Sequence, residues 1–149
     1  MKLAIGNDHS AVEMKKEIKK YLEDKGIEVI DVGTNSTESF NYPISGYKVG
    51  KMVASGEVDG GVLICGTGVG MAIAANKVKG IRACCCSDTF SARMTRAHND
   101  ANILTFGERV VGQGLAMELV DAFLTTEFEG GRHQRRVDLI TKLEQEENS

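Results

Sequence analysis

The chain has 149 residues, a length that suits one domain whose core is large enough to need no disulfide or metal crosslink. Apolar residues make up 42% and charged residues 26% of it, and the net charge of −3 argues against a nucleic-acid-binding surface. No segment is apolar for long enough to cross a membrane, and the chain begins without the long apolar stretch of a signal peptide.

Strands and helices are predicted to alternate along the chain. In order, they are a strand at 2–6, a helix ending at Gly26, a strand at 27–33, a loop at 34–43, a helix reaching about Ala54, a strand at 60–65, a helix of small residues after a glycine turn at 66–70, a strand at 80–86, a helix around 90–97, a strand at 101–107, and helices at about 112–125 and 130–146.

The predicted strands show little polar alternation, which is typical of a parallel sheet covered by helices on both faces. We therefore predict a single α/β domain over residues 1–149, a Rossmann-like, doubly wound three-layer sandwich with a five-stranded parallel sheet. Lysines 15, 16, 19 and 20 are expected to lie largely on the polar face of the first helix. Functional sites in such folds lie at the carboxyl ends of the strands.

The glycine turn GTGVG directly follows the third predicted strand, whose last residue is Cys65. Dinucleotide binding would need a glycine at Met71, and a P-loop would need a lysine right after the last glycine, so both nucleotide motifs fail. The turn still offers converging amides and a helix N-terminus, which can hold an oxyanion. A thiolate is favoured there and could remove a proton next to a carbonyl, with the amides stabilising the enediolate. A buried cysteine before a structural turn is the open alternative.

Two further polar clusters contain histidines. Asp8 and His9 follow the first predicted strand, where Asp8 could simply cap the first helix. His98 precedes the fifth predicted strand and could merely end a helix. Taken alone, each histidine fits a structural or exposed role better than a catalytic one.

The segment GGRHQRR carries the strongest anion-binding pattern. Arg132 and Arg136 are four residues apart and so share a helix face, where two guanidinium groups can grip a phosphate. A solvated basic patch is the alternative, and Arg109 is a further candidate. The three histidines, at positions 9, 98 and 133, have no paired spacing that fits zinc, so we predict no metal site.

Four cysteines occur without any C-x-x-C spacing. Cys84, Cys85 and Cys86 are consecutive, so along a strand they point to alternate faces and make poor disulfide geometry. We predict buried, reduced thiols in a cytoplasmic protein and slower labelling of these three than of Cys65. A redox or thiol-switch role is the alternative.

Taken together and in this order, the motifs GNDHS, EVIDVGT, NYP, GVLICGTGVGMAIAANK, GIRA, HNDANIL, FGERVVG and EGGRHQRRV resemble the ribose-5-phosphate isomerase B family from about residue 2 to about residue 144. The wider group includes isomerases of galactose 6-phosphate and allose 6-phosphate. The resemblance implies a cytoplasmic enzyme that interconverts D-ribose 5-phosphate and D-ribulose 5-phosphate through a cis-enediolate, without a metal or organic cofactor. It also implies a homodimer with shared active sites, and it allows a tetramer.

The resemblance also assigns roles to individual residues. Cys65 is the base, His98 opens the sugar ring with help from Asp8, and Asn99 binds the sugar. The residues that line the enediolate pocket are Gly66, Thr67, Gly68 and Gly70, with Thr67 near the sugar oxygens and Tyr42 near the substrate. The phosphate is held by His9, Arg132 and Arg136, with Arg109 as a helper. His98, Asn99 and Arg109 are expected to come from the neighbouring subunit, and the helix at about 130–146 is expected to pack on that subunit.

Two positions depart from the family pattern. Ala11 replaces the glycine of D-H-x-G, and Asn41 replaces the aspartate of Asp-Tyr-Pro. Because the second change lies near the sugar, a six-carbon phosphate remains an alternative substrate. A non-catalytic phosphosugar-binding module and a nucleotide-dependent enzyme, with Asp88 as its ribose-binding acid, are the alternatives from other classes.

Overall fold

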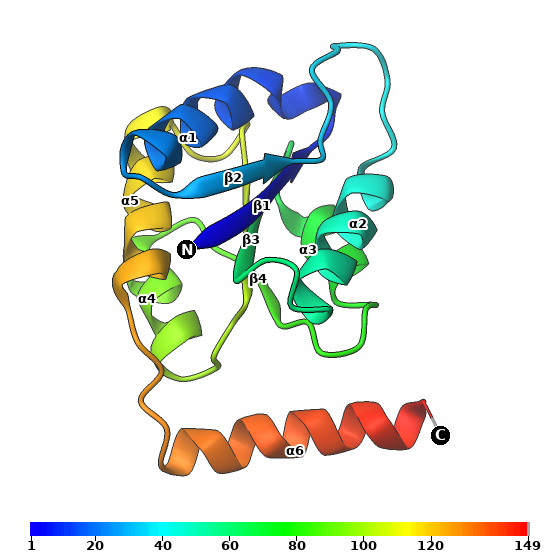
Figure 1. The fold of residues 1–149 in the computed structure, drawn as a ribbon, viewed down its shortest axis with the longest axis vertical. Helices are drawn as coiled ribbons and strands as arrows, with labels where there is room; N and C mark the ends of the chain where they lie inside the picture. The colour runs from blue at the N-terminus through cyan, green and yellow to red at the C-terminus, as the bar shows by residue number, and fades with distance from the viewer. Residues whose placement is uncertain (149) are drawn as a thin grey trace.

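Five parallel strands form one sheet, in the order β2-β1-β3-β5-β4, in the computed structural model, which describes residues 1–148 (Figure 1). The strands are β1 (Lys2–Asn7), β2 (Glu28–Asp31), β3 (Gly60–Cys65), β4 (Ala83–Cys85) and β5 (Ile103–Gly107). The predicted doubly wound α/β fold is confirmed. β2 and β4 are shorter than predicted, because each is an edge strand that pairs on one side only.

The helices occur where the sequence predicts them. They are η1 (His9–Ala11), α1 (Val12–Asp24), α2 (Tyr42–Ala54), α3 (Val69–Ala75), α4 (Thr89–Ala97), α5 (Gln113–Thr125) and α6 (Arg132–Glu147). α2 begins inside the predicted loop, since Pro43 fits the first turn of a helix, where its missing N–H costs nothing. Among residues 1–148, no helix is both long and apolar enough to span a bilayer.

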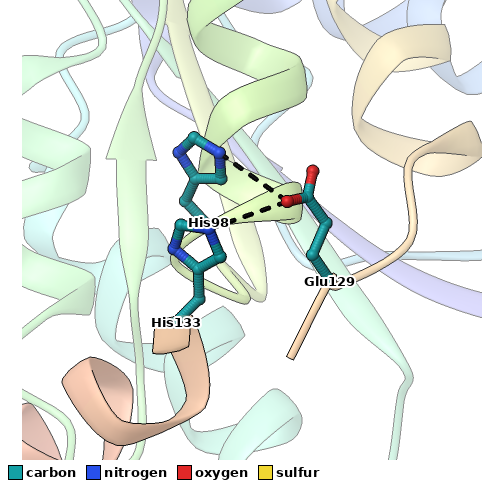
Figure 2. A group of neighbouring side chains, drawn as sticks. All are labelled: His98, Glu129 and His133. Atoms are coloured by element: carbon teal, nitrogen blue, oxygen red, sulfur yellow. Dashed lines mark ion pairs between the residues drawn. The ribbon is translucent and has the colours of Figure 1, made fainter. Parts of the chain in front are cut away.

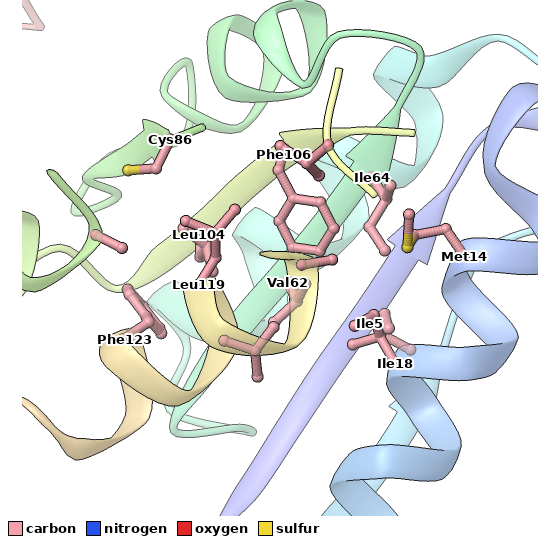
Figure 3. Packing of buried hydrophobic residues seen from close by; sticks show 14 of the residues in the cluster. Ile5, Met14, Ile18, Val62, Ile64, Cys86, Leu104, Phe106, Leu119 and Phe123 are labelled. Atoms are coloured by element: carbon pink, nitrogen blue, oxygen red, sulfur yellow. The ribbon is translucent and has the colours of Figure 1, made fainter. Parts of the chain in front are cut away.

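Both faces of the sheet are buried, as the apolar strands predict. Side chains that alternate along β3 divide between two clusters: Val62 and Ile64 join one, and Leu63 and Cys65 join the other. The first cluster packs beneath α1, α4 and α5 and contains Phe106 (Figure 3). The second packs beneath α2 and α3. The sheet is therefore a rigid layer that fixes the ends of its strands in space.

The chain changes direction at β1. From β1 it continues to β2 on one side, and β3 pairs on the other side. Ligands of doubly wound folds bind in the crevice at such a switch point, outside the carboxyl ends of the strands. In this chain the switch point lies between Asp8, which follows β1, and Cys65, which ends β3. The backbone N–H of Asp8 donates to the Ile64 carbonyl at 3.3 Å.

Lys15 is the exception to the predicted polar face of α1, because its side chain is fully buried. Its Nζ lies 2.8 Å from Asp31 Oδ2, 3.1 Å from the Thr34 carbonyl and 2.7 Å from Asn35 Oδ1. Asn7 binds both backbone groups of Thr34, its Nδ2 donating at 2.9 Å and its Oδ1 accepting at 3.0 Å. The loop after β2 is thus anchored to α1 and to the end of β1.

α6 extends away from the sheet sandwich rather than covering it (Figure 1). Val137 is buried, whereas Leu139, Ile140 and Leu143 are exposed. Near its far end, Glu144 accepts a hydrogen bond from the backbone N–H of Gly80 at 3.0 Å. The helix therefore leaves an apolar surface uncovered within its own chain.

The four cysteines are free thiols, but they are not all buried. Cys86 is buried, and burial raises its pKa to about 12. Cys85 is exposed, and its thiol lies 3.5 Å from the Thr67 carbonyl. The prediction that the three consecutive thiols are buried is wrong for Cys85, because β4 is an edge strand and one of its faces is left open.

Candidate active site

Cys65 is held at the carboxyl end of β3, and a backbone amide points at its sulfur. Its side chain is buried, and the N–H of Gly68 donates to Sγ at 3.1 Å. Gly68 has φ +83°, and a Cβ there would lie 2.7 Å from the Phe106 backbone, so only glycine fits. The turn therefore directs one backbone N–H at the sulfur of Cys65.

The rest of the glycine turn packs on the end of β5. The N–H of Val69, the first residue of α3, donates to Thr67 Oγ1 at 3.2 Å. The N–H of Arg109 donates to the Gly66 carbonyl at 3.1 Å, and its side chain lies against the same glycine. Arg109 therefore belongs to the cysteine loop of its own chain. The expectation that Arg109 serves the site of a neighbouring subunit stays a prediction.

Asp8 and His9 follow β1 at the same edge of the sheet. Asp8 is the N-cap of η1, where its Oδ1 accepts from the Ser10 N–H at 3.0 Å and from the Ser10 hydroxyl at 2.6 Å. The capping interpretation of Asp8 is thus confirmed, without excluding a second role. Nδ1 of His9 accepts from the Phe40 N–H at 3.0 Å, which in a neutral ring places the proton on Nε2.

Tyr42, the first residue of α2, also lies at this edge. A Cβ added to Gly70 would lie 2.6 Å from its ring, so glycine at that position allows the ring to pack on the start of α3. Asn41 is the N-cap of α2, but its side chain makes no capping hydrogen bond. Five candidate residues therefore lie around the glycine turn at the carboxyl edge of the sheet: Cys65, Asp8, His9, Arg109 and Tyr42.

A second group of functional side chains forms around His98, the C-cap of α4 (Figure 2). The rings of His98 and His133 are stacked, with centroids 4.1 Å apart and planes 8° from parallel. One oxygen of Glu129, Oε1, lies 3.6 Å from Nε2 of His133 and 4.0 Å from Nε2 of His98. Burial, with His98 and Arg132 nearby, lowers the pKa of His133 below its usual value.

Glu129 and His133 were not predicted from the sequence. Their spacing of four residues was the available signal, but the partner histidine lies in a distant segment. Donor atoms of His98, Glu129 and His133 lie within 4.8 Å of one another, a set that metal sites also use. Both Nε2 atoms face the same carboxylate oxygen of Glu129, so the three side chains form one cluster.

The two groups lie at opposite edges of the sheet. Cys65 is aligned with Gly107 at the carboxyl end of β5, whereas Gly61 is aligned with Ile103 at its amino end. These two aligned pairs of residues are about 13 Å apart along the strands. α4 runs back from the carboxyl end of β4, so His98 and Asn99 lie near the amino edge.

Arg132 and Arg136 fall in the second group as well. They are exposed residues on the first turns of α6, which begins beside His98. The family resemblance implies that they bind the phosphate in the same site as Cys65. Within one chain the structure does not bring these arginines to the cysteine.

Comparison with known proteins agrees with the motifs. Residues 3–140 match the family described as Ribose/Galactose Isomerase. Ribose-5-phosphate isomerase B of Escherichia coli is 55% identical over 147 residues, covering 99% of each chain. The structure of Clostridium thermocellum ribose-5-phosphate isomerase B is similar, with a TM-score of 0.97 at 54% identity, covering 98% of this chain and 99% of that one. The Mycoplasma genitalium enzyme with bound ribulose-5-phosphate has a TM-score of 0.93 at 40% identity, covering 97% of each chain.

Proposed function

The chain belongs to the ribose/galactose isomerase family, and from that premise we propose that it interconverts D-ribose 5-phosphate and D-ribulose 5-phosphate through a cis-enediolate. It is an aldose–ketose sugar-phosphate isomerase, as the near-complete alignment with ribose-5-phosphate isomerase B requires. The observation that carries the mechanism is the amide of Gly68 on the sulfur of Cys65. Every further step uses groups that the chain itself carries, so we propose no metal or organic cofactor.

Cys65 acts as the base in this mechanism. Its thiolate removes the proton from C2 of the open-chain aldose and returns it to C1, while a proton moves from O2 to O1. Negative charge that develops on the sugar oxygens is stabilised by the amides of residues 66–70. Thr67 and Asp8 lie at the same edge, where they can exchange protons with the sugar oxygens.

Ring opening and phosphate binding need residues from a second copy of the chain. The imidazole and arginine groups lie near the amino edge of the sheet and Cys65 lies at the carboxyl edge, and the stretch of β3 from Gly61 to Cys65 spans about 13 Å. A twofold dimer would bring the His98 edge and α6 of one copy to the cysteine edge of the other. The exposed Leu139, Ile140 and Leu143 on α6 support such an interface.

In the assembled site, Asn99 and His98 of one copy would meet the sugar held by the other. Arg132 and Arg136 would grip its phosphate with His9, and Arg109 would help, as the resemblance implies. Tyr42 would cover the end of the site that holds the sugar. Association of two dimers into a tetramer is compatible with this plan. Four free thiols support a reducing compartment, and we assign the enzyme to the cytoplasm.

Subunit mixing tests the shared site. Cys65→Ala and His98→Asn homodimers should each be nearly inactive, because every site lacks one essential group. Refolding them together should restore activity to about a quarter of the wild-type level, since half the dimers are mixed and each carries one intact site. Mixing each variant with itself is the control. A mixture that stays as inactive as its components would contradict a shared site.

Substrate preference is tested with a panel of pentose and hexose phosphates, assayed with chelator present. We expect ribose 5-phosphate to have the highest kcat/KM. Asn41 and Ala11 keep allose 6-phosphate and galactose 6-phosphate as the alternatives, and a strong preference for either would overturn the ribose assignment. Binding without turnover of any sugar would instead indicate a phosphosugar-binding module.

A further inference from the structure

Among the described residues, Glu129 is the only acid of the charged groups that act on the buried ring of His133. Arg132, Arg136 and a protonated His98 all disfavour a proton on that ring, and Glu129 favours one. Nε2 of His133 is buried and has no hydrogen-bond partner among the described residues. A buried polar atom of this kind is costly unless a partner approaches during function.

The backbone holds Glu129 where its carboxylate faces both rings. Its N–H donates to the Ala97 carbonyl at 3.0 Å, which ties it to the last turn of α4 next to His98. Gly130 and Gly131 follow with φ +68° and +57°, a turn that favours glycine. The chain then enters α6, which places His133 one helical turn after Glu129. Figure 2 shows the carboxylate at the Nε2 edges of both rings.

We infer that Glu129 is a positioning residue for ring opening: its carboxylate orients the stacked His98–His133 pair and helps it retain the proton that the sugar ring oxygen receives. The inference rests on the proposed role of His98. The gaps of 3.6 and 4.0 Å exceed hydrogen-bond length, and such contacts often shorten only when substrate is bound.

The proposed step is balanced. The imidazolium pair gives a proton to the ring oxygen of the furanose, the bond from C1 to that oxygen breaks, and the C1 hydroxyl gives its proton to Asp8. A carbonyl forms at C1, Asp8 releases its proton to solvent, and the pair regains one from solvent. A carboxylate beside the pair stabilises the charged donor that begins this step.

Glu129→Gln tests the inference, because glutamine keeps the size and removes the charge. We expect kcat/KM for ribose 5-phosphate to fall about tenfold at neutral pH. The alkaline limb of its pH profile should also move to lower pH, because an unsupported imidazolium loses its proton earlier. Glu129→Asp should recover part of the activity. Glu127→Gln, which removes an exposed acid two residues away, should match wild type.

A second measurement separates this inference from the proposed function. The chain has three histidines, so proton NMR of the free protein can follow each C2–H signal through a pH titration. In Glu129→Gln the His133 titration should move to lower pH, and in Glu127→Gln it should not. An unmoved His133 signal overturns the inference whatever the kinetics show. Absence of isomerase activity in the wild type would overturn the proposed function while leaving this titration interpretable.

Discussion

Alanine in place of Cys65 is expected to leave a folded protein that binds ribulose 5-phosphate but turns it over about 10³ times more slowly. The reason is that alanine carries no group that can accept the carbon-bound proton. The amides that hold the enediolate remain, so binding should persist. Steady-state kinetics and calorimetric titration with ribulose 5-phosphate measure the two quantities separately.

The matched control is Cys84→Ala, which removes a partly buried thiol from an edge strand and leaves the glycine turn intact. Its turnover should resemble that of wild type. Solvent deuterium should enter the product of the wild type and the control, because a base that exchanges with water carries the proton. Near-normal turnover by Cys65→Ala would disprove the proton-transfer role. Loss of binding would show that the thiol contributes to binding the substrate.

Methionine in place of Lys15 is expected to lower the free energy of unfolding by about 3 kcal/mol. Methionine fills a similar volume, but it leaves Asp31 and Asn35 without the ammonium group that lies 2.8 and 2.7 Å from them. Lys19 compensates little, since its Nζ is 3.7 Å from Asp31. Urea unfolding monitored by circular dichroism measures the change.

The loop after β2 should loosen in the same variant, because Lys15 also holds the Thr34 carbonyl. That loop leads to Phe40, whose N–H fixes the ring of His9, so KM for ribose 5-phosphate should rise. Lys16→Met changes an exposed neighbour and should alter stability by no more than about 0.5 kcal/mol. Equal stability of the Lys15 and Lys16 variants would show that the buried cluster contributes nothing.

The cysteine loop illustrates what could be read from local sequence. An apolar strand followed by a glycine turn places Cys65 beside converging amides, because strand, turn and helix are adjacent in the chain. The structure bears this out with the Gly68 amide on Sγ. Lys15 illustrates the opposite case. Its position on α1 was compatible with solvent, and only the loop that folds over it makes it a buried cation.

The stacking of His98 on His133 could not be predicted from local sequence either, because it too depends on segments that are distant in the chain. His98 and His133 are separated by a strand, a helix and a glycine turn, so their stacking depends on where α6 begins relative to the end of α4. The division of the predicted site residues between two sheet edges also depends on strand register. A motif list carries no information on which edge each residue occupies.

The amino-acid sequence alone determined the parallel sheet, the order of helices and strands along the chain, the cysteine turn and the isomerase family. Apolar periodicity, glycine turns and contiguous motifs are local properties of the chain. Only the tertiary structure decided that Arg109 packs against Gly66 of its own chain, that Arg132 and Arg136 lie near His98, and that Glu129 faces two histidines. Those relations arise from helices folding back across the sheet, and long-range packing of that kind leaves no local pattern.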